Sequence, residues 1–128
     1  MQRHRLKFSR VPGWFAVCQL GPDGPVPDWS MHGGFFSVTR TSEELSIVCP
    51  EEHVPPQVKH ERGWSCWRLE GPFAFSETGI LASFVQPLAE HAIPVFAIST
   101  FNTDYVLVKR DWMEKATQVL RAAGHEEV

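Results

Sequence analysis

The sequence predicts an α+β fold of two tandem βαββαβ units, each an antiparallel sheet with helices on one face. Three observations predict it. The two halves of the chain repeat each other in apolar pattern and turn residues. Residues 80–89 carry apolar side chains at helical spacing, and residues 95–98 and 105–108 are β-branched and aromatic runs joined by a short polar turn.

The repeat appears when one half is slid along the other. Gly13-Trp14 and Gly21-Pro22 match Gly63-Trp64 and Gly71-Pro72 at a shift close to fifty residues. Further on, FFSVTRTSEELSIVCPEE lies without gaps on VFAISTFNTDYVLVKRDW at a shift of sixty. The ten residues that the first half lacks belong to a helix in the second half. We therefore predict an N-terminal unit at 1–62 and a C-terminal unit at 63–128.

The first half is expected to hold short strands and helical turns but no long helix. Its segment GPDGPVPDWSMHGG is rich in glycine and proline, which cannot sustain a helix beyond one turn. The first unit therefore has shortened helices. In order, the expected elements are a strand at 6–9, a break at 11–13, a strand at 14–20, a turn of helix at 28–32, a hairpin of 35–41 with 45–49, a brief helix at 50–53 and a strand at 58–61.

The second half is expected to hold two helices. A strand at 64–69 precedes a helix at 78–91, in which Pro87 removes one hydrogen bond or causes a kink. A hairpin follows, and a last helix begins at Asp111, is capped by Glu114 and stops at Gly124. A strand stub ends the chain. Strand, helix, hairpin, helix and strand is the order of a ferredoxin-like unit.

Composition excludes several classes of function. Twelve basic residues face fifteen acidic ones, for a net charge of −3 without any basic run, so we expect no nucleic-acid partner. No apolar run approaches the roughly twenty residues of a membrane span, and we expect a cytoplasmic protein without a membrane partner. The three cysteines fit no metal or redox spacing and are expected to be free and buried.

Sequence motifs of catalysis and cofactor binding are missing. The six histidines show neither HxH nor HExxH spacing, and no GxSxG, P-loop or GxGxxG motif occurs. We therefore expect no metal, no cofactor and no enzymatic activity. The tryptophans are expected to pack in the core or in an interface rather than to form a carbohydrate or aromatic-cage site.

One stretch of the second half resembles a known family. FSETGIL, followed some twenty residues later by ISTFNTDYVLV and an amphipathic helix, is similar to the second half of small tandem ACT-domain proteins. Such units also occur in the CASTOR-type cytosolic arginine sensors. The resemblance covers residues 64–124 well, and the first half only through VTRTSEELSIVCPEE. It implies the ACT fold, regulatory binding of a free amino acid, and no catalysis.

The resemblance also implies a site, because the sensors bind their ligand at an interface between ACT units, against a helix start and a hairpin tip. Residue chemistry agrees: amides after a capping hydroxyl at Ser76 suit an α-carboxylate, while Glu77 and Asp104 suit a cationic group. Both carboxylates also have a purely structural interpretation, in the turn and at the helix dipole. Carried over by motif position, the candidate ligand residues are Glu77, Thr78, Gly79, Ile80, Thr100, Phe101, Asn102 and Asp104.

Two functions remain open after this reading. The first is a sensor of a free amino acid, arginine or another small one. The sensors contain four ACT units and this chain two, so a homodimer is expected, along with a regulated protein partner. The second is an interaction module that assembles with itself or with a partner and binds no ligand.

Overall fold

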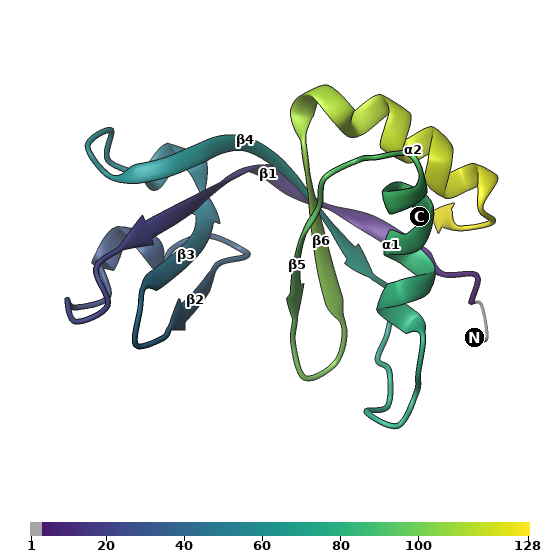
Figure 1. Ribbon diagram of the computed structural model, residues 1–128, viewed down its shortest axis with the longest axis horizontal. Helices are drawn as coiled ribbons and strands as arrows, with labels where there is room; N and C mark the ends of the chain where they lie inside the picture. Colours follow the sequence, from purple (N-terminus) through teal and green to yellow (C-terminus); the bar gives the residue numbers. More distant parts are fainter. Residues whose placement is uncertain (1–3) are drawn as a thin grey trace. The chain divides into compact units, whose positions relative to one another are not determined.

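Two strands, β1 (Lys7–Leu20) and β4 (Lys59–Leu69), run through both of the units into which the chain folds (Figure 1). The computed structural model describes residues 4–128. One unit, called the N-terminal unit, is Pro12–Trp64; the other, the C-terminal unit, combines the residues up to Val11 with Ser65–Val128. The division expected from the sequence, between residues 62 and 63, falls within β4. The first half of β1 groups with the second half of the chain.

The C-terminal unit has the predicted ferredoxin-like order of elements and confirms the α+β class. Its sheet has the strand order β7-β1-β4-β6-β5, so the first half of β1 lies between β7 and β4. Lys7 and Phe8 pair in parallel with Glu126 and Glu127 of β7. After β4 the elements are α1 (Ile80–Glu90), β5 (Phe96–Ser99), β6 (Asp104–Lys109), the 3-10 turn η3 (Arg110–Trp112), α2 (Met113–Ala122) and β7 (Glu126–Glu127).

Three aromatic residues form the centre of this unit's core. Phe8 lies edge-on to Trp67 and to Phe84, with ring centroids 5.5 and 5.2 Å apart. Phe84 and Leu88 are buried four residues apart on one face of α1, as the helical spacing predicts. Figure 1 shows α1 and α2 beside each other, and buried residues of both helices belong to the same core as those of β4 and β6. The helices therefore cover one face of the sheet.

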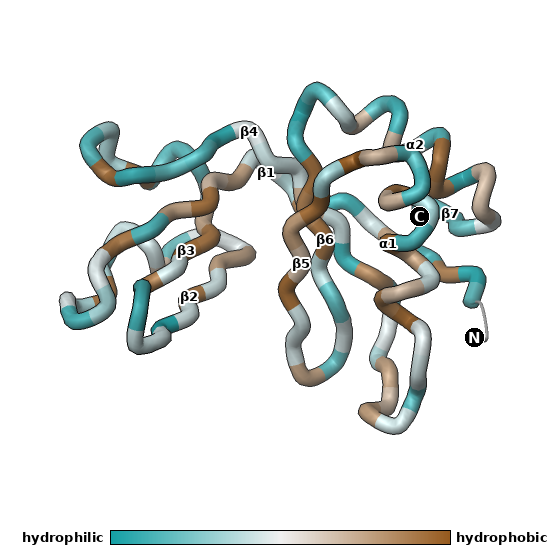
Figure 2. The backbone as a smooth tube through the Cα atoms, in the orientation of Figure 1, coloured by the Kyte–Doolittle hydropathy of each residue, from teal (hydrophilic) through white to brown (hydrophobic). Residues whose placement is uncertain are grey.

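The N-terminal unit keeps the strands and lacks long helices, which confirms the predicted shortening. Its two 3-10 turns have three residues each. Its core includes Ala16, Cys18, Leu45, Ile47 and Cys49, and all three cysteines of the chain are free and buried. Figure 2 shows hydrophobic residues along β3 and β6, the strand of each hairpin that has a neighbouring strand on both sides in the sheet. In order, the elements after β1 are η1 (Asp28–Ser30), β2 (Ser37–Arg40), β3 (Leu45–Pro50) and η2 (Glu51–His53).

The predicted break at 11–13 is wrong, and so is the separation of the strands at 58–61 and 64–69. β1 and β4 are continuous through these places. Gly13 and Gly63 adopt φ of +96° and +81°, a conformation that glycine reaches without the steric cost of a Cβ atom. The Gly-Trp pairs therefore change the course of each strand without ending it, as glycines do at bulges.

The two hairpins correspond at a shift of 59 residues, one less than the gapless alignment predicts. Each has a four-residue turn, which begins at Thr41 in one and at Thr100 in the other. Both turns are closed by the same hydrogen bond, Thr41 N to Glu44 O (2.9 Å) and Thr100 N to Thr103 O (2.8 Å). A shift of one residue reverses which face a side chain occupies, so the corrected register decides which positions correspond.

The capping box expected at the last helix does not form. Arg110–Trp112 make a 3-10 turn, and Trp112 occupies the cap position of α2 without a side-chain hydrogen bond. The predicted end is confirmed, because the amide of Gly124 donates to Arg121 O (3.0 Å) immediately after the helix. A terminal strand stub is likewise present as β7.

Replacing Phe84 by alanine should lower the free energy of unfolding by about 3–5 kcal/mol, because a fully buried ring contacting Phe8 and Trp67 would leave a cavity. Urea denaturation measures the change. The matched control is Phe75→Ala, at a ring that is 77% exposed, which should cost less than about 1 kcal/mol. Equal losses for the two variants would contradict this description of the core.

Candidate functional site

The loop before α1 and the tip of the β5–β6 hairpin enclose a cavity of about 250 Å³. Typical pockets for drug-sized ligands are about 300–1,000 Å³, so this cavity suits a smaller molecule. Its polar groups are hydroxyls, an amide side chain and two carboxylates. The lining residues are Phe73, Ala74, Phe75, Glu77, Ile80, Ser99, Thr100, Phe101, Asn102, Thr103 and Asp104.

Hydrogen bonds hold the loop against the hairpin. The amide of Phe73 donates to Asn102 O (2.8 Å), and the Thr103 hydroxyl donates to Leu69 O (2.6 Å). A Cβ atom at position 71 would lie 3.0 Å from Asn102 O, so the close approach of the two segments needs the glycine found there. The walls of the cavity are therefore fixed by contacts between residues about thirty positions apart in the chain.

The start of α1 offers backbone amides without a side-chain cap. Gly79 occupies the cap position with φ of 78°, and the hydroxyl cap expected from Ser76 is not formed, because the helix begins three residues later. The helix's first turn leaves amides without intrahelical acceptors, as at every helix start. The carbonyl oxygen of Thr78 lies 2.9 Å from His4 Nε2, so this residue contacts a side chain that is not part of the cavity.

The two carboxylates of the cavity each accept one hydrogen bond from their own segment. Glu77 Oε1 accepts from the amide of Ala74 (3.0 Å), and Asp104 Oδ1 accepts from the Ser99 hydroxyl (2.5 Å). Neither carboxylate forms an ion pair with another residue of 4–128. Two negative charges beside a small cavity without a basic partner there favour a cationic group in it.

Six of the eight predicted residues line the cavity: Glu77, Ile80, Thr100, Phe101, Asn102 and Asp104. Thr78 and Gly79 lie at the helix start but outside the cavity wall. Five lining residues were missed by the sequence reasoning: Phe73, Ala74, Phe75, Ser99 and Thr103. Phe75, Ser99 and Thr103 lie within the FSETGIL and STFNTD motifs, which was the available signal, whereas Phe73 and Ala74 only precede FSETGIL.

Two of the lining residues are unusually exposed aromatics. Phe75 and Phe101 are 77% and 78% exposed, and their rings meet edge-on with centroids 4.8 Å apart. One belongs to the loop and the other to the hairpin, so their contact also bridges the two walls. Large exposed apolar groups of this kind are typical of a surface that another molecule covers.

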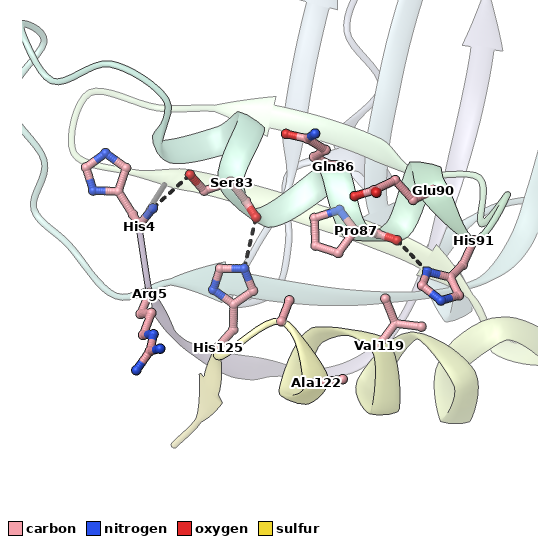
Figure 3. Close-up of a pocket in the computed structure, with 11 residues that line it drawn as sticks. His4, Arg5, Ser83, Gln86, Pro87, Glu90, His91, Val119, Ala122 and His125 are labelled. Atoms are coloured by element: carbon pink, nitrogen blue, oxygen red, sulfur yellow. Dashed lines mark hydrogen bonds between the residues drawn. The ribbon is translucent and has the colours of Figure 1, made fainter. Parts of the chain in front are cut away.

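A larger cavity of about 440 Å³ lies between α1, α2 and the residues before β1, shown in Figure 3. Part of its polar lining is already hydrogen-bonded within the chain. The His4 amide donates to Ser83 Oγ (3.0 Å), His125 Nε2 lies 2.9 Å from Ser83 O, and His91 Nδ1 lies 2.9 Å from Pro87 O. Six of the predicted ligand residues line the hairpin cavity and none lines this one, so the hairpin cavity is the better candidate site.

His125 joins three parts of the C-terminal unit. It is 4% exposed; its Nδ1 accepts from the amide of Leu6 (3.1 Å), so Nε2 carries the proton and donates to Ser83 O. Burial lowers the pKa of His125, and the hydrogen bond to Ser83 opposes this in part. The ring is therefore held in its neutral form.

A metal site is not formed by the described part of the chain: within residues 4–128, no three histidine, cysteine, aspartate or glutamate side chains come together as a ligand set. None of the helices described is both long and apolar enough to cross a membrane.

Comparison with known proteins gives the family. A family model for the ACT domain matches residues 59–122, which is half of the chain. The chain belongs to the ACT-domain family. A second model, describing an N-terminal domain, matches residues 10–57. The ACT match contains both walls of the hairpin cavity and both helices.

Curated relatives of this ACT protein include arginine sensors. The cytosolic arginine sensor for mTORC1 subunit 1 of Bos taurus is 36% identical over 87 residues, covering 59% of this chain and 26% of that protein. The human putative protein CASTOR3P is 36% identical over 91 residues, covering 60% of this chain and 56% of that protein. The chain spans about a quarter to a third of the length of the arginine sensors that it matches.

Solved structures share the fold along nearly the whole chain. A protein from Agrobacterium tumefaciens is 41% identical, with a TM-score of 0.93 and coverage of 98% of this chain and 93% of that one. An aspartate kinase from Clostridium acetobutylicum, an allosteric enzyme, is 13% identical with a TM-score of 0.64, covering 97% of this chain and 36% of that one. The second similarity shows that part of the kinase shares this fold.

Stability should decrease as the pH falls below about 6.5, the ordinary pKa of histidine. The unfolded chain gains a proton at position 125 there, whereas the folded chain resists it, because burial disfavours the charged ring and a protonated Nδ1 could not accept from Leu6. Thermal unfolding between pH 7.5 and 5 measures the effect. The variant His125→Gln should lose part of this dependence; an unchanged pH profile would contradict the role given to the histidine.

Proposed function

We propose that this ACT protein is a cytoplasmic regulatory module that binds a free amino acid, arginine or another small one, in the cavity between the α1 start and the β5–β6 hairpin. The observation that carries the proposal is that the first residue of α1 and two carboxylates line one cavity of about 250 Å³. Similarity to a protein named as an arginine sensor supports it, since the Bos taurus sensor is 36% identical over 87 residues.

The two ends of an amino acid match the two walls. An α-carboxylate binds near the start of α1, where amides of the first turn lack a side-chain cap and the helix dipole is positive. A cationic group binds near Asp104, whose Oδ2 has no partner among the described residues. Phe75 and Phe101 offer ring faces or edges to the aliphatic or cationic part of the ligand.

We propose that a second copy of the chain completes the site. The rings of Phe75 and Phe101 that line the cavity are exposed, and β5, at one end of the strand order, has one edge without a neighbouring strand. The match covers 26–34% of the length of the arginine sensors, so those proteins contain further polypeptide outside the matched segment. Dimerisation supplies that extra surface here, and ligand bound at the interface changes how the copies or a protein partner assemble.

Calorimetric titration with the twenty amino acids should give a saturable response to one of them. Replacing Asp104 by alanine should weaken that binding at least about tenfold, because a charge-assisted hydrogen bond of roughly 1.5–3 kcal/mol is removed. The matched control is Asp111→Ala, at an exposed carboxylate in η3 outside the cavity, which should leave the affinity unchanged. Binding that survives Asp104→Ala would locate the ligand elsewhere.

A second candidate function is an interaction module without a ligand. It is favoured by one specific observation: Glu77 and Asp104 already accept hydrogen bonds from Ala74 and Ser99 of the same chain. In that case the exposed aromatic pair serves protein association alone. No calorimetric response to any of the twenty amino acids, together with a stable dimer, favours this candidate over the sensor.

The double variant Phe75→Ser with Phe101→Ser should raise the dissociation constant of the dimer at least about tenfold, because aromatic anchors dominate such interfaces. Sedimentation velocity over a range of protein concentrations measures it. As a control, Met31→Ser removes an exposed apolar side chain of the N-terminal unit and should leave association unchanged. A dimer of undiminished affinity in the double variant would place the interface on another surface.

A further inference from the structure

Arg40, the last residue of β2, ties the N-terminal unit's hairpin to the loop that follows β1. Its guanidinium donates through Nη1 to the carbonyl oxygen of Pro22 and through Nη2 to that of Gly24 (2.6 Å). A planar guanidinium can satisfy two acceptors at once, which an ammonium group cannot do in the same geometry. The loop carbonyls of Pro22 and Gly24 therefore form a two-point guanidinium site.

The repeat shows what stands at the same place in the C-terminal unit. Arg40 comes directly before the four-residue turn at Thr41, as Ser99 comes before the turn at Thr100. Gly21-Pro22 of the N-terminal loop matches Gly71-Pro72 of the C-terminal loop. Arg40 thus spans from hairpin to loop in one unit at the position where the other unit has a short serine and the candidate ligand cavity.

The residues after the two turns differ in a complementary way. Asp104 supplies a carboxylate after the C-terminal turn, whereas its counterpart Leu45 is apolar and fully buried. The cavity beside the N-terminal loop, about 480 Å³, is lined mainly by leucine, proline and glycine. The C-terminal cavity is therefore lined by acidic groups and no basic residue, whereas in the N-terminal unit Arg40 donates to backbone carbonyls of the loop.

We infer that Arg40 is a built-in occupant of the N-terminal unit's counterpart of the ligand site. The site recognises a guanidinium group through the carbonyls of Pro22 and Gly24, and the chain fills it from within. A free guanidinium compound can enter only when the Arg40 side chain is removed. The claim that the C-terminal cavity is a ligand site rests on the proposed function. The claim that Arg40 occupies a guanidinium site does not.

The test is chemical rescue of Arg40→Ser in the full chain, followed by thermal unfolding. Losing two charge-assisted hydrogen bonds at an exposed position should lower the melting temperature by about 3–5 °C. Methylguanidinium chloride at about 50 mM should then raise the melting temperature of the variant by roughly 1–2 °C through binding to the folded state. It should not raise that of the wild-type protein, whose site is already occupied.

Controls separate this rescue from a general salt effect. Methylammonium chloride at the same concentration should not rescue Arg40→Ser, because it offers a point charge without the two-pronged geometry. Arg121→Ser, which removes another exposed arginine, should show no rescue by methylguanidinium. A melting temperature of Arg40→Ser equal to that of the wild type would overturn the inference, as would an equal response of both proteins to methylguanidinium.

Should Arg40→Ser fail to fold, Arg40→Lys provides the second variant, since it keeps the aliphatic stem and the charge. Its melting temperature should lie below that of the wild type, because an ammonium group replaces the planar guanidinium that donates to both carbonyls. Equality with the wild type would overturn the inference. The readout involves no amino-acid ligand, so a negative amino-acid titration would count against the sensor alone and leave this result unaffected.

Discussion

The contact between the loop before α1 and the β5–β6 hairpin is the constraint on which the candidate site depends. Phe73 donates its amide to Asn102, and Thr103 donates its hydroxyl to Leu69, so the loop and the hairpin tip cannot move independently without breaking these bonds. Because both bonds end on backbone carbonyls, they fix the walls while leaving most side chains free to meet a ligand. The helix start and Asp104 share one cavity for this reason.

The core of the C-terminal unit depends in turn on residues near the beginning of the chain. Phe8, fully buried against Trp67 and Phe84, belongs to the first half of β1, and the β7 strand pairs with the same segment. His125 adds a polar link, since it accepts from Leu6 and donates to Ser83 of α1. The segment that matches the ACT family model thus completes its core only with strand residues that precede the match.

The hairpins of the two units have the same turn but differ in the residues beside it. Both hairpins have the same four-residue turn, started by a threonine and closed by the same backbone hydrogen bond. The flanking positions then decide the outcome: Arg40 closes one loop against its hairpin, and Ser99 with Asp104 leaves the other open. The proposed function assigns ligand binding to the C-terminal unit and leaves the N-terminal unit a supporting role.

The sequence by itself determined the elements that depend on local chemistry. Helical spacing from Ile80 to Leu88, the β-branched runs around the Thr100 turn and the helix-breaking composition after Gly21 each act within a few residues, so their pattern is legible in one dimension. Six of the eight expected site residues line the cavity because two local motifs, the helix start and the hairpin tip, carry them.

Tertiary structure alone decided how those elements join. The continuity of β1 through Pro12, the place of its first half in the C-terminal sheet and the 59-residue register of the hairpins all depend on pairing with distant strands. Phe73, Phe75 and Ser99 line the same cavity only because the loop contacts the hairpin, although about thirty positions separate the contacting residues in the chain. Long-range pairing and packing are set by the whole core, and a local pattern of residues contains no record of them.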